Sequence, residues 1–366
     1  MNRLVSTILE NLKNVRRSDS TNSVMAVDHC FSIKGKGTVF TGTVTKGSFK
    51  VGQNFEIPEF GLERAIKSIQ CFKKQMKEVR QGDRAAFMVA PLKSDEIERC
   101  LLTTPGYLKK IGGVITTVEV CKYFKGSIKS KGKFHISIGH LNIMADVFLF
   151  LSKENDEDTS KIMSTISNFR LNELNEKDYL FDLSREYELV NEIDKDRIKL
   201  AKRELTHTDL QEKKQFVMAY LKFQKPLFIV PYSFYIGARF DFQTEKKNCR
   251  IAFSGVTLAS FQESVEAYVP PALKLVTDKK KAGIIEKFFD DYTVIIKDMF
   301  KKETNLGLFM NKDVFVDESE LKGKMTASFG SSGKVKVVFA ENVKEKYPDL
   351  IGKPVHIINK KYQKLI

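Results

Sequence analysis

The chain of 366 residues is long enough for two or three domains, each with a hydrophobic core of its own. Its 61 Lys and Arg residues against 46 Asp and Glu give a net charge of +15, which favours a polyanion or an acidic surface as partner. The five cysteines are scattered and never spaced as Cys-x-x-Cys, so neither a disulfide framework nor a zinc site is predicted. No apolar run approaches the roughly 20 residues that span a bilayer, and the N-terminus lacks the pattern of a cleaved leader. We therefore expect a cytoplasmic protein with no membrane partner.

The first predicted element is a short amphipathic helix over residues 2–16. Its apolar residues recur every three or four positions, as they do on one face of a helix: Leu4, Ile8, Leu9, Leu12 and Val15. After a polar break the pattern changes, over residues 24–89, to apolar runs of about five residues separated by turn residues. Such runs are typical of the strands of a β-barrel or a β-sandwich.

Two glycines, Gly35 and Gly37, stand between β-rich runs and predict a tight hairpin or a bulge. The stretch from Gly37 to Gly42 also has the G-x-x-x-x-G spacing of a phosphate-binding loop. Position 43 is Thr, however, and such a loop needs Lys there to reach the β- and γ-phosphates of a nucleotide. No other stretch supplies GxxxxGK[ST], so we expect that this chain neither binds nor hydrolyses GTP and is not itself an enzyme.

Strand-like runs return at residues 111–150 and 216–259, and the segment between them has a different composition. Residues 151–215 contain neither Gly nor Pro and carry more acidic than basic side chains. We expect an insertion, partly helical and partly disordered, in a barrel whose strands lie on both sides of it. A small helical domain is the alternative interpretation of this segment.

A domain boundary is predicted at Pro270 and Pro271, because the pair disfavours helix and removes two backbone donors. Beyond it, polar and apolar residues alternate again. Residues 330–333, with the sequence GSSG, predict the turn of a hairpin. On its second strand, Lys334 and Lys336 are expected on one face and the valines next to them on the other.

Several of these stretches together resemble the eukaryotic selenocysteine-specific elongation factors, which are translational GTPases of the elongation factor Tu type. The stretches "VDHCFSIKGKGTVFTGTVTKG", "VGQNFEIP", "VRQGDRAAFMV" and "ERCLLTTPG" resemble the second domain of that type. Nearer the C-terminus, "GIIEKFFDDYTVIIKDMFKKETNLGLF" and "FGSSGKVKV" are similar to the eukaryotic selenocysteine factors more narrowly. The resemblance is specific because stretches from two domains occur in the expected order.

The resemblance implies a mainly β fold of three consecutive translation-factor barrels, with a short N-terminal helix and a mixed helical and disordered insertion in the second barrel. It also implies a division into four parts. These are residues 1–23, the remnant of the last GTPase-domain helix with its linker; residues 24–109, the domain 2 barrel; residues 110–268, the domain 3 barrel with its insertion at about 151–215; and residues 269–366, a C-terminal domain 4 barrel that binds RNA or a partner.

In that family a GTPase domain precedes the barrels, so the resemblance implies that this domain is missing from the present chain. GTP and Mg²⁺ are then expected only with the missing domain, and no cofactor is expected here. The implied function is to bind selenocysteyl-tRNA for selenocysteine incorporation at UGA codons. The implied partners are selenocysteyl-tRNA, the ribosome, and the selenocysteine insertion hairpin RNA or the protein that binds it.

The family's selenocysteine pocket corresponds to Asp28, His29 and Arg84 in this chain, by resemblance. The chemistry is suitable, because a selenol is an anion at neutral pH whereas the hydroxyl of a misacylated seryl-tRNA is neutral. Arg84 is charged at every relevant pH, and His29 can be charged or can donate a hydrogen bond. Asp28 could orient them or receive the ammonium group of the esterified amino acid.

Three lysine pairs in the C-terminal part are candidates for contact with the RNA backbone, which supplies affinity and salt dependence. They are Lys301 and Lys302, Lys334 and Lys336, and Lys360 and Lys361. A solvated strand face is the alternative interpretation for each pair. Phe329 and Tyr362 are the aromatic residues closest to these lysines, and we expect both to belong to the core.

Two other functions stay open on the sequence alone. One is a fragment of a different translational GTPase, such as an initiation or termination factor. The other is a standalone RNA-binding β-barrel protein that never meets the ribosome. The remaining histidines have no carboxylate or cysteine at metal-ligand spacing, and no nucleophile elbow is present, so no catalytic site is predicted.

Overall fold

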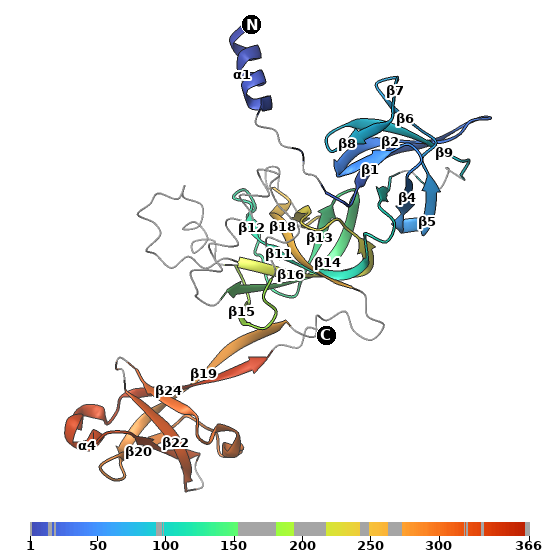
Figure 1. Cartoon of the computed structure of the whole chain (residues 1–366). Helices are drawn as coiled ribbons and strands as arrows, with labels where there is room; N and C mark the ends of the chain where they lie inside the picture. The colour runs from blue at the N-terminus through green and yellow to red at the C-terminus, as the bar shows by residue number, and fades with distance from the viewer. Residues whose placement is uncertain are drawn as a thin grey trace. The chain divides into compact units, whose positions relative to one another are not determined.

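The computed structural model (Figure 1) describes residues 2–13, 17, 20–92, 97, 99–152, 181–193, 217–241, 249–262, 273–317, 319, 321–330 and 333–362. The chain forms two compact units, Met1–Lys274 together with Leu365–Ile366, and Leu275–Lys364. The predicted boundary at Pro270 and Pro271 lies outside the described residues, as does most of the predicted insertion at 151–215.

The chain begins with the predicted helix, α1 (Asn2–Lys13). Its apolar side chains stay exposed to solvent; Leu4, for example, is 65% exposed and Leu12 is 59% exposed. The helix therefore presents an apolar face that no described part of the chain covers. Within the described ranges, no helix is long and apolar enough to cross a membrane.

The first barrel follows from Val24 to Thr103, with short and long strands. Its elements are β1 (Val24–Ile33), β2 (Gly37–Lys46), β3 (Ser48–Lys50), β4 (Asn54–Ile57), η1 (Pro58–Phe60), β5 (Leu62–Ala65), β6 (Ser68–Cys71), β7 (Lys74–Met76), β8 (Glu78–Arg80), β9 (Arg84–Val89) and β10 (Leu101–Thr103). The main sheet has the order β5-β4-β10-β1-β2-β9-β6-β7, and β3 pairs with β8. Four fully buried phenylalanines fill its core: Phe40, Phe49, Phe55 and Phe87.

The β1–β2 hairpin confirms the turn predicted at Gly35 and Gly37. Both glycines have a positive φ, and a Cβ on Gly37 would lie 2.1 Å from the carbonyl oxygen of Val89. The stretch from Gly37 to Gly42 is part of β2, whose backbone pairs with β1 and β9. It is therefore a strand and not a phosphate-binding loop.

The second barrel closes on itself. Its elements are β11 (Lys110–Thr117), β12 (Glu119–Val120), β13 (Gly132–Ile138), β14 (Leu141–Ser152), β15 (Glu186–Val190), β16 (Val217–Phe228), β17 (Phe234–Ala238) and β18 (Ile251–Gln262). Antiparallel pairing runs from β13 through β14, β16, β11, β18 and β17 back to β13. Strands β14, β16 and β18 have 12 residues each. Closure leaves no free edge among these six strands.

Strand β15 corrects the expectation for the described end of the predicted insertion. Residues 181–193 contain a strand that pairs with β14, where helix or disorder was expected. The reason is visible in its alternation, because Tyr187 and Leu189 point into the protein while Glu188 is exposed. Phe181 stacks on Tyr187 and extends this small core.

The third barrel belongs to the second compact unit and also closes. Its elements are β19 (Lys274–Phe288), β20 (Thr293–Lys297), η4 (Leu306–Phe309), β21 (Asp313–Val316), β22 (Lys322–Phe329), β23 (Lys334–Phe339), α4 (Val343–Lys346), η5 (Pro348–Leu350) and β24 (Pro354–Tyr362). Pairing runs from β19 through β20, β23, β22, β21 and β24 back to β19. The mainly β fold of consecutive barrels is thus confirmed (Figure 1).

The first and second barrels meet through a small apolar cluster, and a polar contact lies next to it. Val24, Leu101 and Leu108 are buried there against Tyr107 and Phe228. Nearby, Nε2 of His140 in the second barrel lies 3.6 Å from Oε1 of Glu59 in the first. This junction is continuous with the segment that connects the two barrels.

Candidate functional site

The structure brings Asp28 and Arg84 together on neighbouring parts of the first barrel. The β1–β2 register shifts between Val27 and His29, so Asp28 is the extra residue of a β-bulge. Gly42 permits this bulge, because a Cβ there would lie 2.0 Å from the carbonyl oxygen of Ala26. Arg84 is the first residue of β9 and pairs across the sheet with Thr43 of β2.

The two side chains form an ion pair at the surface. Nη1 of Arg84 lies 2.6 Å from Oδ2 of Asp28, and the same nitrogen lies 3.5 Å from Oγ1 of Thr43. The Arg84 side chain is 52% exposed and that of Asp28 is 43% exposed, so solvent screens the pair and it contributes little to folding stability. The Arg84 guanidinium is accessible to a ligand from solution, whereas Oδ2 of Asp28 is covered and, apart from its contact with Arg84, has no hydrogen-bond partner among the described residues.

His29 stands beside this pair but makes no contact with it. Its side chain is exposed, and its backbone carbonyl accepts a hydrogen bond from Oγ1 of Thr41 at 3.5 Å. Among the described residues, the His29 ring has no hydrogen bond or ion pair. Of the three residues predicted for the pocket, the structure therefore joins two and leaves the third as a neighbour on the same strand.

The turn before Arg84 explains why the arginine is held in place. Gly82 has a positive φ of 90°, and Oδ2 of Asp83 accepts a hydrogen bond from the backbone N–H of Arg80 at 2.8 Å. Asp83 also lies 3.2 Å from Nη2 of Arg17, in the segment that follows helix α1. Cys71 donates from its thiol to the backbone carbonyl of Arg84 at 2.8 Å. The backbone of the arginine is thus fixed, while its side chain is exposed and contacts Asp28.

In the C-terminal barrel, Lys334 and Lys336 lie on the second strand of the predicted hairpin, with Val335 and Val337 fully buried on its other face. Lys334 is ion-paired with Glu286 at 2.6 Å, and the hydrogen bond from Lys334 lowers the pKa of the Glu286 carboxyl. Nζ of Lys336 lies 3.4 Å from the ring centroid of Phe289. Both ammonium groups therefore already have a partner within the barrel.

Lys301 and Lys302 are placed differently. They lie in an exposed turn, closed by a hydrogen bond from the N–H of Thr304 to the carbonyl of Lys301. A Cβ on Gly333 would lie 2.4 Å from the carbonyl oxygen of Phe300, so this turn packs against the base of the β22–β23 hairpin. Within the described parts of the chain, neither lysine forms an ion pair.

Lys360 and Lys361 lie at the end of β24, opposite Asp278 and Thr277 of β19. Asp278 is eight positions from Glu286 along β19, which is roughly 26 Å at about 3.3 Å per residue. This end of the barrel is therefore separate from the Lys334 site. The pairing adds three lysines that the sequence analysis did not select, although they form an evident run: Lys279, Lys280 and Lys281.

The two aromatic residues expected in the core are partly exposed. Tyr362 is 55% exposed, and Phe329 is half-buried with its ring edge-on to Phe289 at 6.1 Å. The expectation is wrong for Tyr362, because the last three residues of β24 are all exposed.

Two cysteines of the first barrel, Cys30 and Cys100, are partly or fully buried. Burial raises the pKa of the Cys30 thiol to about 11 and that of Cys100 further still, so both are protonated at neutral pH. In the parts of the chain that the structure describes, no group of three or more His, Cys, Asp or Glu residues could hold a metal ion.

Comparisons with known proteins agree with this architecture. The sequence model of the third domain of eukaryotic selenocysteine-specific elongation factors matches residues 115–255, and that of the eEFSec C-terminal RIFT domain matches residues 271–364. The mouse selenocysteine-specific elongation factor is 32% identical over 349 residues, which cover 91% of this chain and 57% of the mouse protein. The factor from Methanocaldococcus jannaschii is 34% identical over 165 residues, covering 44% of this chain and 35% of that protein.

Solved structures show the same fold. Elongation factor SelB from Methanococcus maripaludis, in complex with the GTP analogue GppNHp, superposes with a TM-score of 0.68 at 18% identity, covering 99% of this chain and 68% of SelB. Its apo form gives 0.65 at 19% identity, with 99% and 67% covered. The chain thus spans little more than half the length of the mouse relative. Two domain models, a long alignment and a shared fold together show that this chain belongs to the eukaryotic selenocysteine-specific elongation factor family.

Proposed function

We propose that this chain binds selenocysteyl-tRNA for the incorporation of selenocysteine, with the Asp28–Arg84 pair as the site that recognises the amino acid. The observation that carries the proposal is the exposed ion pair itself, held by a bulge and a fixed turn on the first barrel. The family membership supports selenocysteine incorporation over a different translational GTPase or a standalone RNA-binding protein.

The pair is complementary to the charges of the bound amino acid. A selenocysteine esterified to tRNA carries an α-ammonium group and, at neutral pH, a selenolate. Asp28 can bind the ammonium group while Arg84 faces the selenolate. Each of the two residues then has an oppositely charged group of the ligand as its partner in place of the other residue. Serine has the ammonium but no anion, so Arg84 gains nothing from it and loses part of its contact with Asp28.

Selectivity for selenocysteine over serine requires that the bound tRNA exclude water from the Asp28–Arg84 pair. In free solution the half-exposed pair is screened, and a charge contact is worth little. Once the tRNA end excludes water, leaving one charge without a partner costs about 2–5 kcal/mol. His29, exposed on the same strand, is placed to add a donor near the bound group.

The residues present do not fit GTP. None of the three stretches with GxxxxG spacing, residues 37–42, 42–47 and 47–52, is followed by the Lys that a phosphate-binding loop needs, and residues 37–42 are part of the paired strand β2. We therefore propose that GTP and Mg²⁺ are held by a GTPase domain outside the residues described, and we assign no step of nucleotide hydrolysis to these barrels.

The C-terminal barrel supplies a second interaction in this proposal. Lys301 and Lys302 in their exposed turn are the best placed of the predicted lysines to meet phosphates, because Lys334 is already paired with Glu286. We assign this barrel the selenocysteine insertion hairpin RNA or its binding protein as partner, within the ribosomal complex.

The test is the substitution Arg84→Ala, measured as the ratio of affinities for selenocysteyl-tRNA and seryl-tRNA. We expect the ratio to fall by about 30-fold or more, the equivalent of at least about 2 kcal/mol. The control is Arg80→Ala, which removes an exposed arginine four residues away that contacts Glu78 at 3.5 Å. Equal ratios in Arg84→Ala and the parent chain would contradict the assignment.

A further inference from the structure

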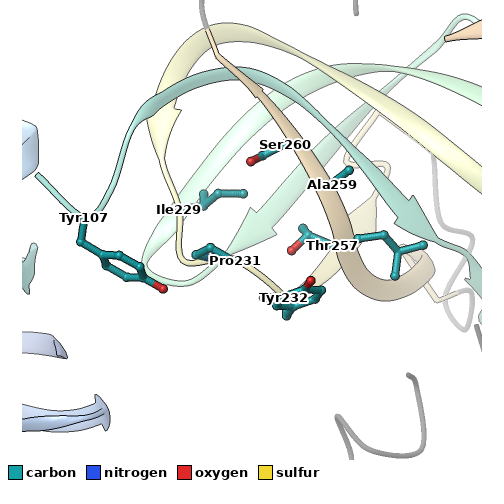
Figure 2. A pocket seen from close by; sticks show the side chains of 8 residues that line it. Tyr107, Ile229, Pro231, Tyr232, Thr257, Ala259 and Ser260 are labelled. Carbon is teal, nitrogen blue, oxygen red and sulfur yellow. The ribbon is translucent and has the colours of Figure 1, made fainter. Parts of the chain in front are cut away.

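A pocket of about 270 Å³ lies on the second barrel beside the segment that joins it to the first (Figure 2). Tyr107 comes from the connecting segment, Pro231 and Tyr232 from the turn between β16 and β17, and Thr257 from β18. Figure 2 shows Tyr107 and Tyr232 on two sides with Pro231 between them. The pocket does not contain Asp28 or Arg84.

Local geometry builds the pocket from both elements. The β11–β18 register shifts between Ile115 and Thr116, which leaves Leu258 as an extra residue next to Thr257. Tyr232 has a φ of 58°, which is uncommon outside glycine, and the turn is held by a 2.6 Å hydrogen bond from Oγ of Ser233 to the carbonyl of Val230. The bulge beside Thr257 and the turn at Tyr232 therefore determine where these two side chains point.

One buried polar atom in this pocket has no partner. Thr257 is only 3% exposed, and its Oγ1 has no hydrogen-bond partner, although its backbone N–H donates to Ser233 at 3.0 Å. An unsatisfied buried hydroxyl costs about 1–3 kcal/mol, so its retention needs an explanation. In Figure 2 the hydroxyl points toward Pro231 and Tyr232, on the side of the pocket space.

The residues that line the pocket indicate which class of ligand it can bind. None of the eight residues that line the pocket carries a charge, and two are tyrosines. A planar, neutral group that stacks on aromatic rings and offers a hydrogen bond to a hydroxyl matches such a lining, and a nucleobase has these properties. The volume is below the range of about 300–1,000 Å³ for drug-sized ligands, so one nucleoside fits and a dinucleotide does not.

The ammonium group of Lys46 lies at the edge of the pocket formed by Tyr107. A phosphate next to a base bound in the pocket would lie on this side. Nζ of Lys46 donates to the hydroxyl of Tyr107 at 3.0 Å and lies 5.3 Å from its ring centroid. Lys109 and Lys110 are exposed within three residues of Tyr107. The arrangement of a neutral aromatic interior with basic residues at the connecting segment suits an unpaired nucleotide that remains attached to its strand.

We infer that this pocket holds one unpaired nucleobase with its ribose from an RNA strand, stacked by Tyr107 and hydrogen-bonded by Thr257. The inference rests on the proposed function, in which the chain binds RNA, and it adds a base-binding position separate from the Asp28–Arg84 site. A free nucleotide has the same base chemistry but lacks the neighbouring phosphates that the strand offers to the lysines.

The experiment uses the whole chain and a fluorescent single-stranded RNA of about 12 nucleotides with 5-iodouridine at one position. Anisotropy gives the affinity, and ultraviolet crosslinking followed by peptide mapping gives the place of contact. We expect crosslinks at Tyr107 or Tyr232. Thr257→Val keeps the shape of the side chain and should lower affinity about fivefold with no loss of thermal stability, and Tyr107→Leu should lower it about tenfold.

The matched control is Thr103→Val. Thr103 is 0% exposed and its Oγ1 also lacks a partner, but it lies on β10 and does not line the pocket. If the Thr257 hydroxyl has only a structural role, both valine variants should have the same RNA affinity. If it binds a base, only Thr257→Val should lose RNA affinity. Unchanged affinity in Thr257→Val, with crosslinks elsewhere, would overturn the inference and leave the Arg84 proposal standing.

Two further outcomes are decisive. If uridine monophosphate at the same concentration displaces the RNA from the pocket, a free nucleotide and not a strand is the source of the base, and the inference is overturned. If the chain does not bind this RNA, the inference is overturned, whereas the Arg84 proposal depends on the separate measurement with the two aminoacyl-tRNAs.

Discussion

The first barrel and the C-terminal barrel use charge in different ways. In the first, Asp28 and Arg84 come from two strands and meet at 2.6 Å, with a bulge and a fixed turn determining their positions. In the C-terminal barrel, charges of one sign are spread over a turn, a strand face and a ribbon end, and several are already paired or lie on aromatic rings. A fixed pair of opposite charges can select a small group, whereas scattered lysines supply affinity that depends on salt. The predictions that follow separate these two uses.

The largest effect on stability and selectivity is expected from changing Gly42, because this glycine permits the β-bulge that positions Asp28 beside Arg84. Gly42→Ala places a Cβ 2.0 Å from the carbonyl oxygen of Ala26, so the bulge has to shift. We expect the free energy of unfolding to fall by about 3 kcal/mol, together with the preference for selenocysteyl-tRNA. Chemical denaturation and the affinity ratio measure the two effects.

The control for this change is Gly35→Ala. Gly35 has a positive φ of 76° but has open space around the position of a Cβ. Its substitution should cost only about 1 kcal/mol, from conformational strain, and should leave the affinity ratio unchanged. Equal stability of Gly42→Ala and the parent chain would show that the bulge is not fixed by this glycine.

A smaller effect is expected from the turn of the C-terminal barrel. The double substitution Lys301→Ala and Lys302→Ala removes two exposed charges and should reduce the slope of log affinity for hairpin RNA against log salt by about 1.4 to 1.8. The affinity ratio between the two aminoacyl-tRNAs should not change, because this turn does not touch the amino acid. Binding measured across a salt series gives the slope.

A second pair of lysines gives the matched control for net charge. Lys344 and Lys346 are ion-paired with Asp291 at 3.5 Å and Glu341 at 2.8 Å. Their double substitution by alanine changes the net charge equally but removes lysines that are already neutralised, so the slope should change less. The same slope change in both double variants would mean that only total charge matters.

The smallest effect concerns the contact between the first two barrels. Burial raises the pKa of Glu59, so the folded chain binds this proton more tightly than the unfolded chain. The ionised carboxylate therefore costs stability above the raised pKa, and the cost vanishes as pH falls below the ordinary value of 4.5. Glu59→Gln should be more stable at neutral pH by up to about 1 kcal/mol, with the difference closing on acidification.

His140 does not offset this cost at neutral pH. Its pKa is lowered, mainly by burial and then by Arg99, so the ring is neutral where Glu59 is charged. Thermal denaturation of the parent and Glu59→Gln between pH 4 and pH 8 measures the difference. A gap that widens on acidification would contradict the raised pKa of Glu59.

The fold was largely predictable because its signals are local. Alternating residues and glycine turns indicate strands such as β22 and β23, and Gly35 and Gly37 indicate the first hairpin. The bounds of the individual strands within residues 111–150 were not predicted, because a continuous strand-like run does not show where one strand ends and the next begins; β14, for example, runs from Leu141 to Ser152. β15 was missed for a different reason: its alternation occupies five residues inside a charged segment.

The candidate sites were predictable only in part. The Asp28–Arg84 contact joins residues that are 56 positions apart, and resemblance rather than local pattern indicated it. The clustering of Lys279, Lys280 and Lys281 with Lys360 depends on the pairing of β19 and β24, which the sequence does not specify. The pocket at Thr257 has no sequence pattern, because a bulge, a turn and a connecting segment create it together.

The most direct test of the account is competition between selenocysteyl-tRNA and seryl-tRNA of the same tRNA body for the unmodified chain at constant salt. We expect at least about thirtyfold tighter binding of selenocysteyl-tRNA, because Arg84 meets an anion in one case and a neutral hydroxyl in the other. Equal affinity for the two would contradict the central claim that this exposed ion pair recognises the amino acid.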